Sequence, residues 1–376
     1  MCGMLLVCLA LGAIAFVIAL PIVWRLISVS ARRGHVDRPD DRFAHKLDVR
    51  PVPNTGGLGV FLALGVPLLV LLVVARLDGS SGDEVTAWAR LVRAVREHAT
   101  VLVGYLLVTF VAHIMGLVDD RRPLGPRFKL GMQIGIALFI AAVLDLRIFE
   151  LLDARLGPVG YVASVVITML WIVVITNAMN FLDNMDGLAG GVGAIIAALY
   201  LAATIIHGQW VIAIICALLV GALLAFLIFN VAPARIYMGD GGSLVVGVTL
   251  AIVSIHTTYF DPGGEQPGEW YGLLMPLMLL AVPLYDFTSV TLIRLSQGRS
   301  PLVGDRQHFS HRLVAKGLSV RGAVGVIWLC TLATGLSGVM LGTLATWQAA
   351  LAAGQTAAVI AVLALLEWSG RTRPDR

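Results

Sequence analysis

The sequence has 376 residues, of which 58% are apolar and only 13% are charged, and its mean hydropathy is +0.89. This composition excludes a soluble globular protein and indicates a polytopic membrane protein. The net charge of +4 fits basic loops that face anionic lipid, and nothing in the sequence indicates binding to nucleic acid.

Apolar stretches that approach or reach the length needed to cross a membrane recur along the chain, and they predict an all-α fold with about eleven transmembrane helices. In chain order these stretches are Met4–Ile27, Leu58–Val74, Val101–Val118, Leu130–Leu144, Tyr161–Ile175, Leu188–Ile206, Trp210–Phe229, Leu244–Ile255, Leu273–Ile293, Ala323–Leu341 and Trp347–Leu366. Because no internal repeat and no low-complexity linker interrupts them, we expect residues 1–376 to form a single integral membrane domain.

The distribution of Lys and Arg predicts how the chain is oriented in the membrane. The odd-numbered connections and the C-terminal tail hold 20 of the 27 Lys and Arg residues, whereas residues 261–269 carry acids and no base. We therefore expect the N-terminus outside, the C-terminus in the cytoplasm, and the odd-numbered connections on the cytoplasmic side of the inner (plasma) membrane.

The connection at residues 78–97 is predicted to form a short amphipathic helix. Its apolar residues would rest on lipid at the outer membrane surface. They are Val85, Trp88, Leu91, Val92 and Val95.

The most informative polar feature is the run Asn177, Asn180, Asp183 and Asp186, which follows the apolar stretch Tyr161–Ile175. Carboxylates and amides at a membrane edge are costly, so they indicate a functional site that holds a cation or a polar ligand. All the dense polar sequence falls on connections predicted to be cytoplasmic. We expect one composite active site there, built from the loops near residues 45–57, 119–129, 177–190, 230–243 and 294–312.

The residue types of this site favour particular ligands. Carboxylates without clustered Cys or His favour a hard cation, Mg²⁺ first and Mn²⁺ second. Basic side chains and the glycines around Asp240 suit phosphate groups, because Arg and Lys bind their oxygens and glycine admits close approach of the backbone. These features indicate phosphoryl transfer between a soluble nucleotide-linked donor and a lipid phosphate.

Six motifs that occur in order resemble the polyprenyl-phosphate N-acetylhexosamine-1-phosphate transferases, which are related to phospho-N-acetylmuramoyl-pentapeptide-transferase. The matching residues are His45 with Arg50 to Gly57; Asp119, Asp120, Leu124 and Lys129; Asn177, Asn180, Asp183, Asp186, Gly187 and Leu188; Asn230, Pro233, Tyr237, Gly239, Asp240 and Ser243; Pro283, Asp286, Val290 and Arg294; and Asp305, Arg306, His308 and His311.

The resemblance implies transfer of a sugar 1-phosphate from a UDP-N-acetylhexosamine to a polyprenyl phosphate such as undecaprenyl phosphate, with release of UMP. It implies that Asp240 and Asn180 bind Mg²⁺ and that Asp119, Asp120 and Asp183 are catalytic. The residues that it assigns to substrate binding are Lys129, Asn177, Asp186, Asn230, Tyr237, Arg294, Arg306, His308 and His311.

Two residues depart from the family pattern, in which glycine often stands at the position of Asn184 and histidine at that of Ser310. The donor sugar, the glycan pathway (lipopolysaccharide, teichoic acid or exopolysaccharide) and the existence of a homodimer stay open. An enzyme of peptidoglycan synthesis that uses a muramoyl-pentapeptide donor is one alternative, and a membrane transporter is another. A CDP-alcohol phosphatidyltransferase is disfavoured, because no acid follows Asp186 before Asp240.

Overall fold

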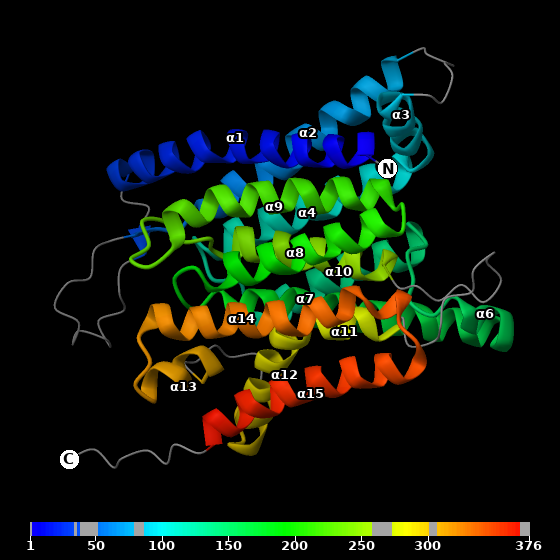
Figure 1. Cartoon of the computed structure of the whole chain (residues 1–376). Helices are drawn as coiled ribbons and strands as arrows, with labels where there is room; N and C mark the ends of the chain where they lie inside the picture. Colours follow the sequence, from blue (N-terminus) through cyan, green and yellow to red (C-terminus); the bar gives the residue numbers. More distant parts are fainter. Residues whose placement is uncertain are drawn as a thin grey trace, which may run out of the picture.

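The computed structural model describes residues 2–33, 36–37, 52–78, 86–257, 273–300 and 307–368, and nearly all of the described chain is helical (Figure 1). The helices are α1 (Cys2–Arg33), α2 (Gly56–Leu77), α3 (Ala87–Glu97), α4 (Ala99–Asp119), α5 (Pro126–Leu138), the π-helix η2 (Phe139–Val143), α6 (Leu151–Leu156), α7 (Pro158–Leu182), α8 (Leu188–Ile206), α9 (Trp210–Asn230), α10 (Asp240–His256), α11 (Met275–Leu279), α12 (Ala281–Ser296), α13 (Phe309–Ala315), α14 (Val320–Val339), the 3-10 helix η4 (Leu341–Thr343) and α15 (Thr346–Trp368). Two short strands, β1 (Val36–Asp37) and β2 (Val52–Pro53), pair antiparallel.

The prediction of an all-α polytopic membrane protein is confirmed. Within the described ranges, nine helices are long and apolar enough to cross a membrane, namely α1, α2, α4, α5 with η2, α7, α8, α9, α14 and α15. The other two predicted spans have different forms: α10 has 17 residues, and the predicted span Leu273–Ile293 is divided between α11 and α12. The count of eleven spans therefore stays a prediction.

Apolar helices occupy both the centre and the rim of the bundle. In α9, 83% of the most apolar stretch is buried inside the protein, against 17% in α15. A helix that is apolar on all sides lies either in a core or against lipid. Thus α9 is a central helix, whereas the apolar side chains of α15 are directed toward lipid.

Helix α10 lies at the centre of the fold and carries the Gly-Asp-Gly-Gly motif at its start. It packs against α2, α4, α7, α8 and α9, and every residue from Gly241 to Ile255 is buried. The approach of α4 depends on Gly116, where a Cβ atom would lie 2.3 Å from backbone atoms of Asp240 and Gly241. Small residues allow this kind of close helix contact within membranes, and here the contact positions Asp240.

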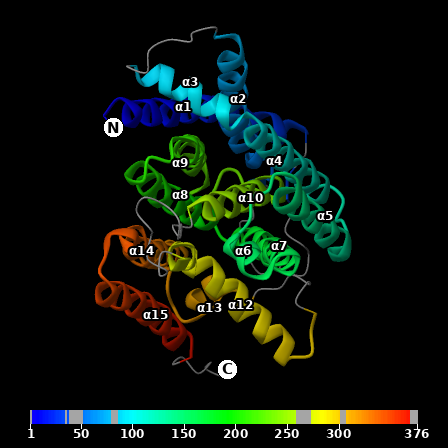
Figure 2. The same ribbon diagram turned by 90° about the vertical axis from the view of Figure 1, so that its right-hand side faces the viewer.

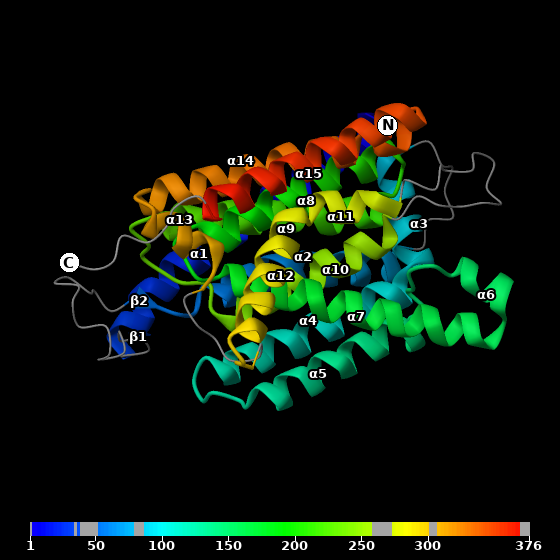
Figure 3. The ribbon, with the colours of Figure 1, turned by 90° about the horizontal axis from the view of Figure 1, so that it is seen from below.

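The long helices run roughly parallel, and the start of α1 and the end of α15 lie at opposite ends of the bundle (Figure 1). Seen along the bundle in Figure 2, α10 lies between α4, α7 and α8. Helix α12 is the exception to the parallel arrangement, because it runs at a steep angle to α14 and α15 (Figure 3). Its tilt brings α12 against α7 beside the end of that helix.

The structure corrects the prediction for the amphipathic helix. Helix α3 forms as expected, but its apolar residues Leu91, Val92 and Val95 are buried. These three face protein and not lipid, because α3 packs against α1, α2, α4 and α9. Trp88, by contrast, is 46% exposed. Val85 lies outside the described residues.

Candidate active site

An ion-paired cluster joins three helices at one end of the bundle. The ammonium Nζ of Lys129, in the first turn of α5, lies 2.8 Å from Asp119 Oδ2 and 2.6 Å from Asp240 Oδ2. Asp119 is the last residue of α4 and Asp240 the first of α10. Each of these side chains keeps 14–25% of its surface exposed, so the cluster is accessible from solution.

The second oxygen of Asp240 is bound by the polar run at the end of α7. Asn180 Nδ2 donates to Asp240 Oδ1 and to the hydroxyl of Ser243, each over 2.9 Å. Asp119 is fixed from its other side, because the backbone N–H of Leu124 donates to its Oδ1 over 2.7 Å. The predicted metal ligands Asp240 and Asn180 are therefore in direct contact.

Asp120 caps helix α10. Its carboxylate accepts hydrogen bonds from the backbone amides of Asp240 (2.9 Å) and Gly241 (3.2 Å) and from Asn54 Nδ2 (3.3 Å). A carboxylate at a helix N-terminus satisfies free N–H groups and interacts favourably with the helix dipole. The backbone turns into α10 at Gly239, which has a φ of 70°, a conformation that glycine adopts without steric cost.

Negative charge is concentrated at this end of the bundle. Burial, followed by the negative charges of Asp240 and Asp120, raises the pKa of Asp183 to about 8. Burial also raises the pKa of Asp120 to about 6, although the hydrogen bonds from the start of α10 act in the opposite direction. A cation placed among these carboxylates would stabilise their ionised forms.

The donor set fits a hard divalent cation that is completed by substrate. Within the described ranges, no three His, Cys, Asp or Glu side chains are arranged as a metal site. Mg²⁺, however, is commonly held by one or two carboxylates together with substrate phosphates and water. Asp240 would supply a carboxylate, and Asn180 would supply an amide oxygen if its side chain were turned, since its Nδ2 now faces Asp240. The ammonium of Lys129 already lies between Asp119 and Asp240, which shows that their carboxylates can share a cation.

A cavity of about 310 Å³ begins at these residues and continues between α5, α7 and α12. Lys129, Asn177 and Asn180 lie on its polar side. Asn177 is held by Gln133 of α5, since its Nδ2 donates to Gln133 Oε1 over 2.6 Å. The remaining wall consists largely of apolar residues, namely Leu124, Pro126, Leu130, Val173, Phe181 and Phe287, with Thr291.

The loops after α7 and α9 are bound to each other. Asp186 Oδ2 accepts the backbone N–H of Ala234 over 2.9 Å. Buried Asn230 accepts from the backbone amide of Gly187 over 3.0 Å and donates to the carbonyl of Ile236 over 2.9 Å. These bonds make Asn230 a residue that joins two loops. Tyr237 lies in the second loop, whose backbone also pairs with residues 53 and 56.

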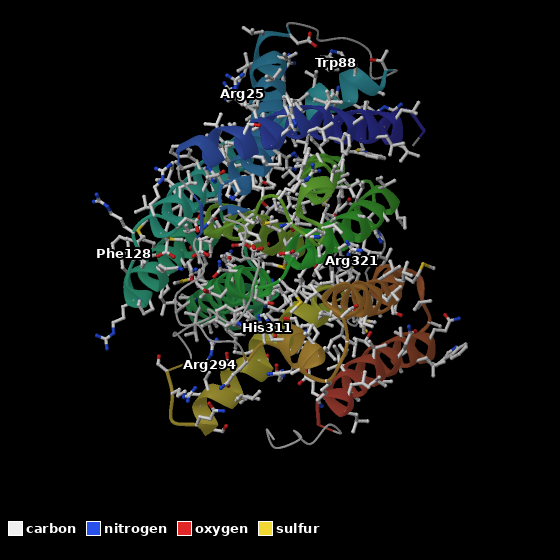
Figure 4. All side chains as sticks on the ribbon, turned by 90° about the vertical axis from the view of Figure 1, so that its left-hand side faces the viewer. Arg25, Trp88, Phe128, Arg294, His311 and Arg321 are labelled. Atoms are coloured by element: carbon white, nitrogen blue, oxygen red, sulfur yellow. The ribbon has the colours of Figure 1, made fainter. Side chains whose placement is uncertain are left out.

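The segment from His308 to His311, called the histidine segment below, lies at the start of α13 and is bound to α12. Fully buried Asp286 accepts hydrogen bonds from His308 Nδ1 over 2.8 Å and from the backbone amide of Phe309 over 3.0 Å. Arg294 of α12 is also buried, and its Cζ lies 5.1 Å from the centre of the Phe181 ring. Figure 4 labels Arg294, in α12, and His311, in α13, seen from the end of the bundle opposite the start of α1. Arg306, His45 and Arg50 lie outside the described residues.

Sequence reasoning missed Gln133 and Phe181 as parts of this site. Gln133 lies four residues after Lys129, so helical spacing places both side chains on one face of α5. Phe181 lies between Asn180 and Asp183, but its side chain is apolar, and the site was predicted from polar residues alone. Its ring contacts His308 edge-on, with the ring centres 5.4 Å apart.

The fold and the site define a class, that of integral membrane proteins with a carboxylate and lysine centre at one end of a helix bundle. Comparison with known proteins gives the family. The pattern of glycosyl transferase family 4 matches residues 102–258, which include every member of the ion-paired cluster. The chain belongs to this family, specifically to the polyprenyl-phosphate N-acetylhexosamine-1-phosphate transferases, as its motifs predicted.

Three relatives illustrate the similarity. The decaprenyl-phosphate N-acetylglucosaminephosphotransferase of Mycolicibacterium smegmatis is 33% identical over 322 residues, which cover 80% of this chain and 74% of the relative. A Bacillus subtilis protein named probable undecaprenyl-phosphate N-acetylglucosaminyl 1-phosphate transferase is 29% identical, with coverage of 89% and 86%. The undecaprenyl-phosphate alpha-N-acetylglucosaminyl 1-phosphate transferase of Escherichia coli K12 is 26% identical, with coverage of 80% and 75%.

Proposed function

We propose that this protein transfers N-acetylglucosamine 1-phosphate from UDP-N-acetylglucosamine to a polyprenyl phosphate in cell-envelope glycan synthesis. An oxygen of the lipid phosphate attacks the β-phosphorus of the donor. The bond from that phosphorus to the bridging oxygen breaks, so UMP leaves and a polyprenyl-pyrophosphoryl sugar forms. The names of the three relatives support this choice of donor and acceptor.

The observation that carries the proposal is the placement of Lys129 between Asp119 and Asp240. A phosphate monoester loses its second proton near pH 6, so the lipid phosphate is largely a dianion and needs little help from a base. The ammonium of Lys129 neutralises phosphate charge, while Asp119 orients the attacking phosphate. Positioning and charge stabilisation are the main contributions that proteins make to phosphoryl transfer.

Asp240 and Asn180 are the proposed ligands of Mg²⁺, with Mn²⁺ as a substitute. When bound there, the cation would neutralise the charge that develops on the pyrophosphate. The loops that carry Asp183, Asp186 and Tyr237 hold the nucleotide in this proposal. Arg294, His308 and His311, with Arg306, bind the sugar and pyrophosphate.

The cavity between α5, α7 and α12 supplies a place for the acceptor. Its apolar wall suits the first isoprene units, and its polar side at Lys129 suits the phosphate. A lipid that enters between helices stays in the membrane while its phosphate reaches the carboxylates. We further propose that eleven segments span the inner membrane, with the N-terminus outside and the site in the cytoplasm.

An assay of UMP release tests the proposed function. Purified protein is mixed with undecaprenyl phosphate, Mg²⁺ and, in turn, each of a panel of UDP-sugars. We expect UMP with UDP-N-acetylglucosamine, and removal of Mg²⁺ by EDTA should abolish it reversibly. An Asp240→Asn variant that stays folded should lose more than about 99% of the rate, since one preorganised electrostatic contact contributes about 10²–10³-fold. Release of no UMP with any donor by folded protein would refute the enzyme proposal.

A further inference from the structure

Two segments of the candidate site that lie far apart in the sequence are joined by one hydrogen bond between side chains. The hydroxyl of Ser310, in α13, donates to Asn184 Oδ1, in the loop between α7 and α8, over 2.7 Å. Ser310 is fully buried.

The amide of Asn184 is fixed in one orientation. Its Nδ2 donates to the backbone carbonyl of Phe181 over 2.5 Å, so its Oδ1 is left to accept the proton of Ser310. A buried hydroxyl that loses its acceptor forfeits hydrogen bonding that water can no longer replace. The two side chains are therefore expected to act as a unit, and changing either one breaks the connection.

The aromatic side chain of Phe181 adds to the same contact between loops. Its ring meets His308 edge-on at 5.4 Å, and the guanidinium of Arg294 lies above it at 5.1 Å. Asp286 holds the other side of the histidine segment. The segment is thus held between α12 and the end of α7, and the Asn184–Ser310 bond sets its distance from the loop of Asp183.

We propose that Asn184 and Ser310 are a positioning pair for the donor substrate. They fix the distance between the nucleotide half of the donor site, in the loop that carries Asp183 and Asp186, and the sugar-phosphate half, at the histidine segment. This inference rests on the proposed function. A nucleotide-sugar must contact both halves at once, so it gains affinity from their fixed spacing. UMP lacks the sugar and the β-phosphate, so it makes fewer contacts with the second half and depends less on the pair.

The test is a double-mutant cycle with Asn184→Ala, Ser310→Ala and the double variant. Each protein is assayed for the KM of UDP-N-acetylglucosamine, for kcat, and for the inhibition constant of UMP. We expect either single variant to raise KM about tenfold, the size of a lost buried hydrogen bond. The UMP inhibition constant should change less than about threefold, and the double variant should resemble the single ones, because contacting residues are not additive.

A matched control is Ser337→Ala, which removes a hydroxyl that bonds Gln355 over 3.0 Å between α14 and α15, away from the site. It should leave KM unchanged. Ser310→Cys keeps the side-chain volume but weakens the donor, so it should raise KM in the same direction by less, and it serves if an alanine variant does not fold.

Three results would overturn the positioning role. They are an unchanged KM in folded variants, additive effects in the double variant, or an equal rise in the UMP inhibition constant and in the KM of the donor. Failure of the proposed function can be told apart from failure of the positioning role, because in that case the unmodified protein would release no UMP.

Discussion

Asp119 and Asp120 are neighbours in the chain, but their carboxylates contact different groups. Asp119 pairs with Lys129 at the accessible cluster, whereas Asp120 accepts the first backbone amides of α10. Asp119 and Asp120 were both predicted to be catalytic from the resemblance. Under the proposed function, Asp119 would face substrate, whereas Asp120 caps the helix that presents Asp240.

At the residue scale, Asp286→Asn tests whether His308 must be oriented by a carboxylate. Asparagine still accepts the amide of Phe309 but lacks the negative charge beside His308 Nδ1. Because hydrogen bonds to charged groups contribute roughly 1.5–3 kcal/mol, we expect kcat/KM for the donor to fall about tenfold or more. The measurement is steady-state kinetics on protein whose melting temperature has been checked.

The matched control is Asp145→Asn, which changes an exposed carboxylate paired with Arg147 outside the site. Its activity should equal that of the unmodified protein. Equal activity of Asp286→Asn would instead mean that the position of His308 does not depend on the charge of Asp286.

At the scale of elements, the length of the apolar stretches located most helices, because a membrane span consists of consecutive apolar residues. The run Asn177 to Asp186 could also be predicted as part of a functional site, because its four polar groups follow directly on an apolar stretch. The division of one predicted span into α11 and α12 was not visible, because no charge or glycine marks Leu280. The contact between Asn184 and Ser310 was equally invisible, since it depends on how distant helices pack.

The contact between α4 and α10 gives a prediction at this scale. Gly116→Ala places a methyl group 2.3 Å from backbone atoms of Asp240 and Gly241, which cannot move as a flexible side chain can. Overpacking of this kind costs about 1–3 kcal/mol. We expect a lower melting temperature, measured by intrinsic fluorescence, and a loss of activity of more than about tenfold as Asp240 is displaced.

Gly135→Ala in α5 is the matched control, because nothing lies within 4 Å of the added methyl group. Alanine favours a helix over glycine by up to about 1 kcal/mol, so this variant should be as stable as the unmodified protein or more so. If the two variants melt alike, the close approach of α4 to α10 is not a constraint on the fold.

At the scale of the whole molecule, the site residues gather at one end of the bundle, opposite the start of α1 (Figures 1 and 4). Single cysteines test which side of the membrane this end faces. In a chain whose native cysteines are replaced by alanine, exposed Glu97 and exposed Arg299 are each changed to cysteine. A maleimide that cannot cross membranes should label Glu97→Cys in intact cells and should label Arg299→Cys only after the cells are opened.

Labelling with the opposite pattern would reverse the proposed orientation while leaving the chemistry of the site unchanged. Activity of each cysteine variant provides the control that the protein is folded. Both positions lie outside the contacts of the carboxylate cluster, so we expect each variant to retain its activity.

The gathering of the described site residues at a single end has a consequence for the movement of lipid-linked sugars. Under the proposed function, the acceptor, the donor and the lipid-linked product would all meet the protein at the same leaflet, because the buried, apolar α9 and α10 fill the centre of the bundle. A glycan that is needed on the opposite surface therefore requires a separate translocation step.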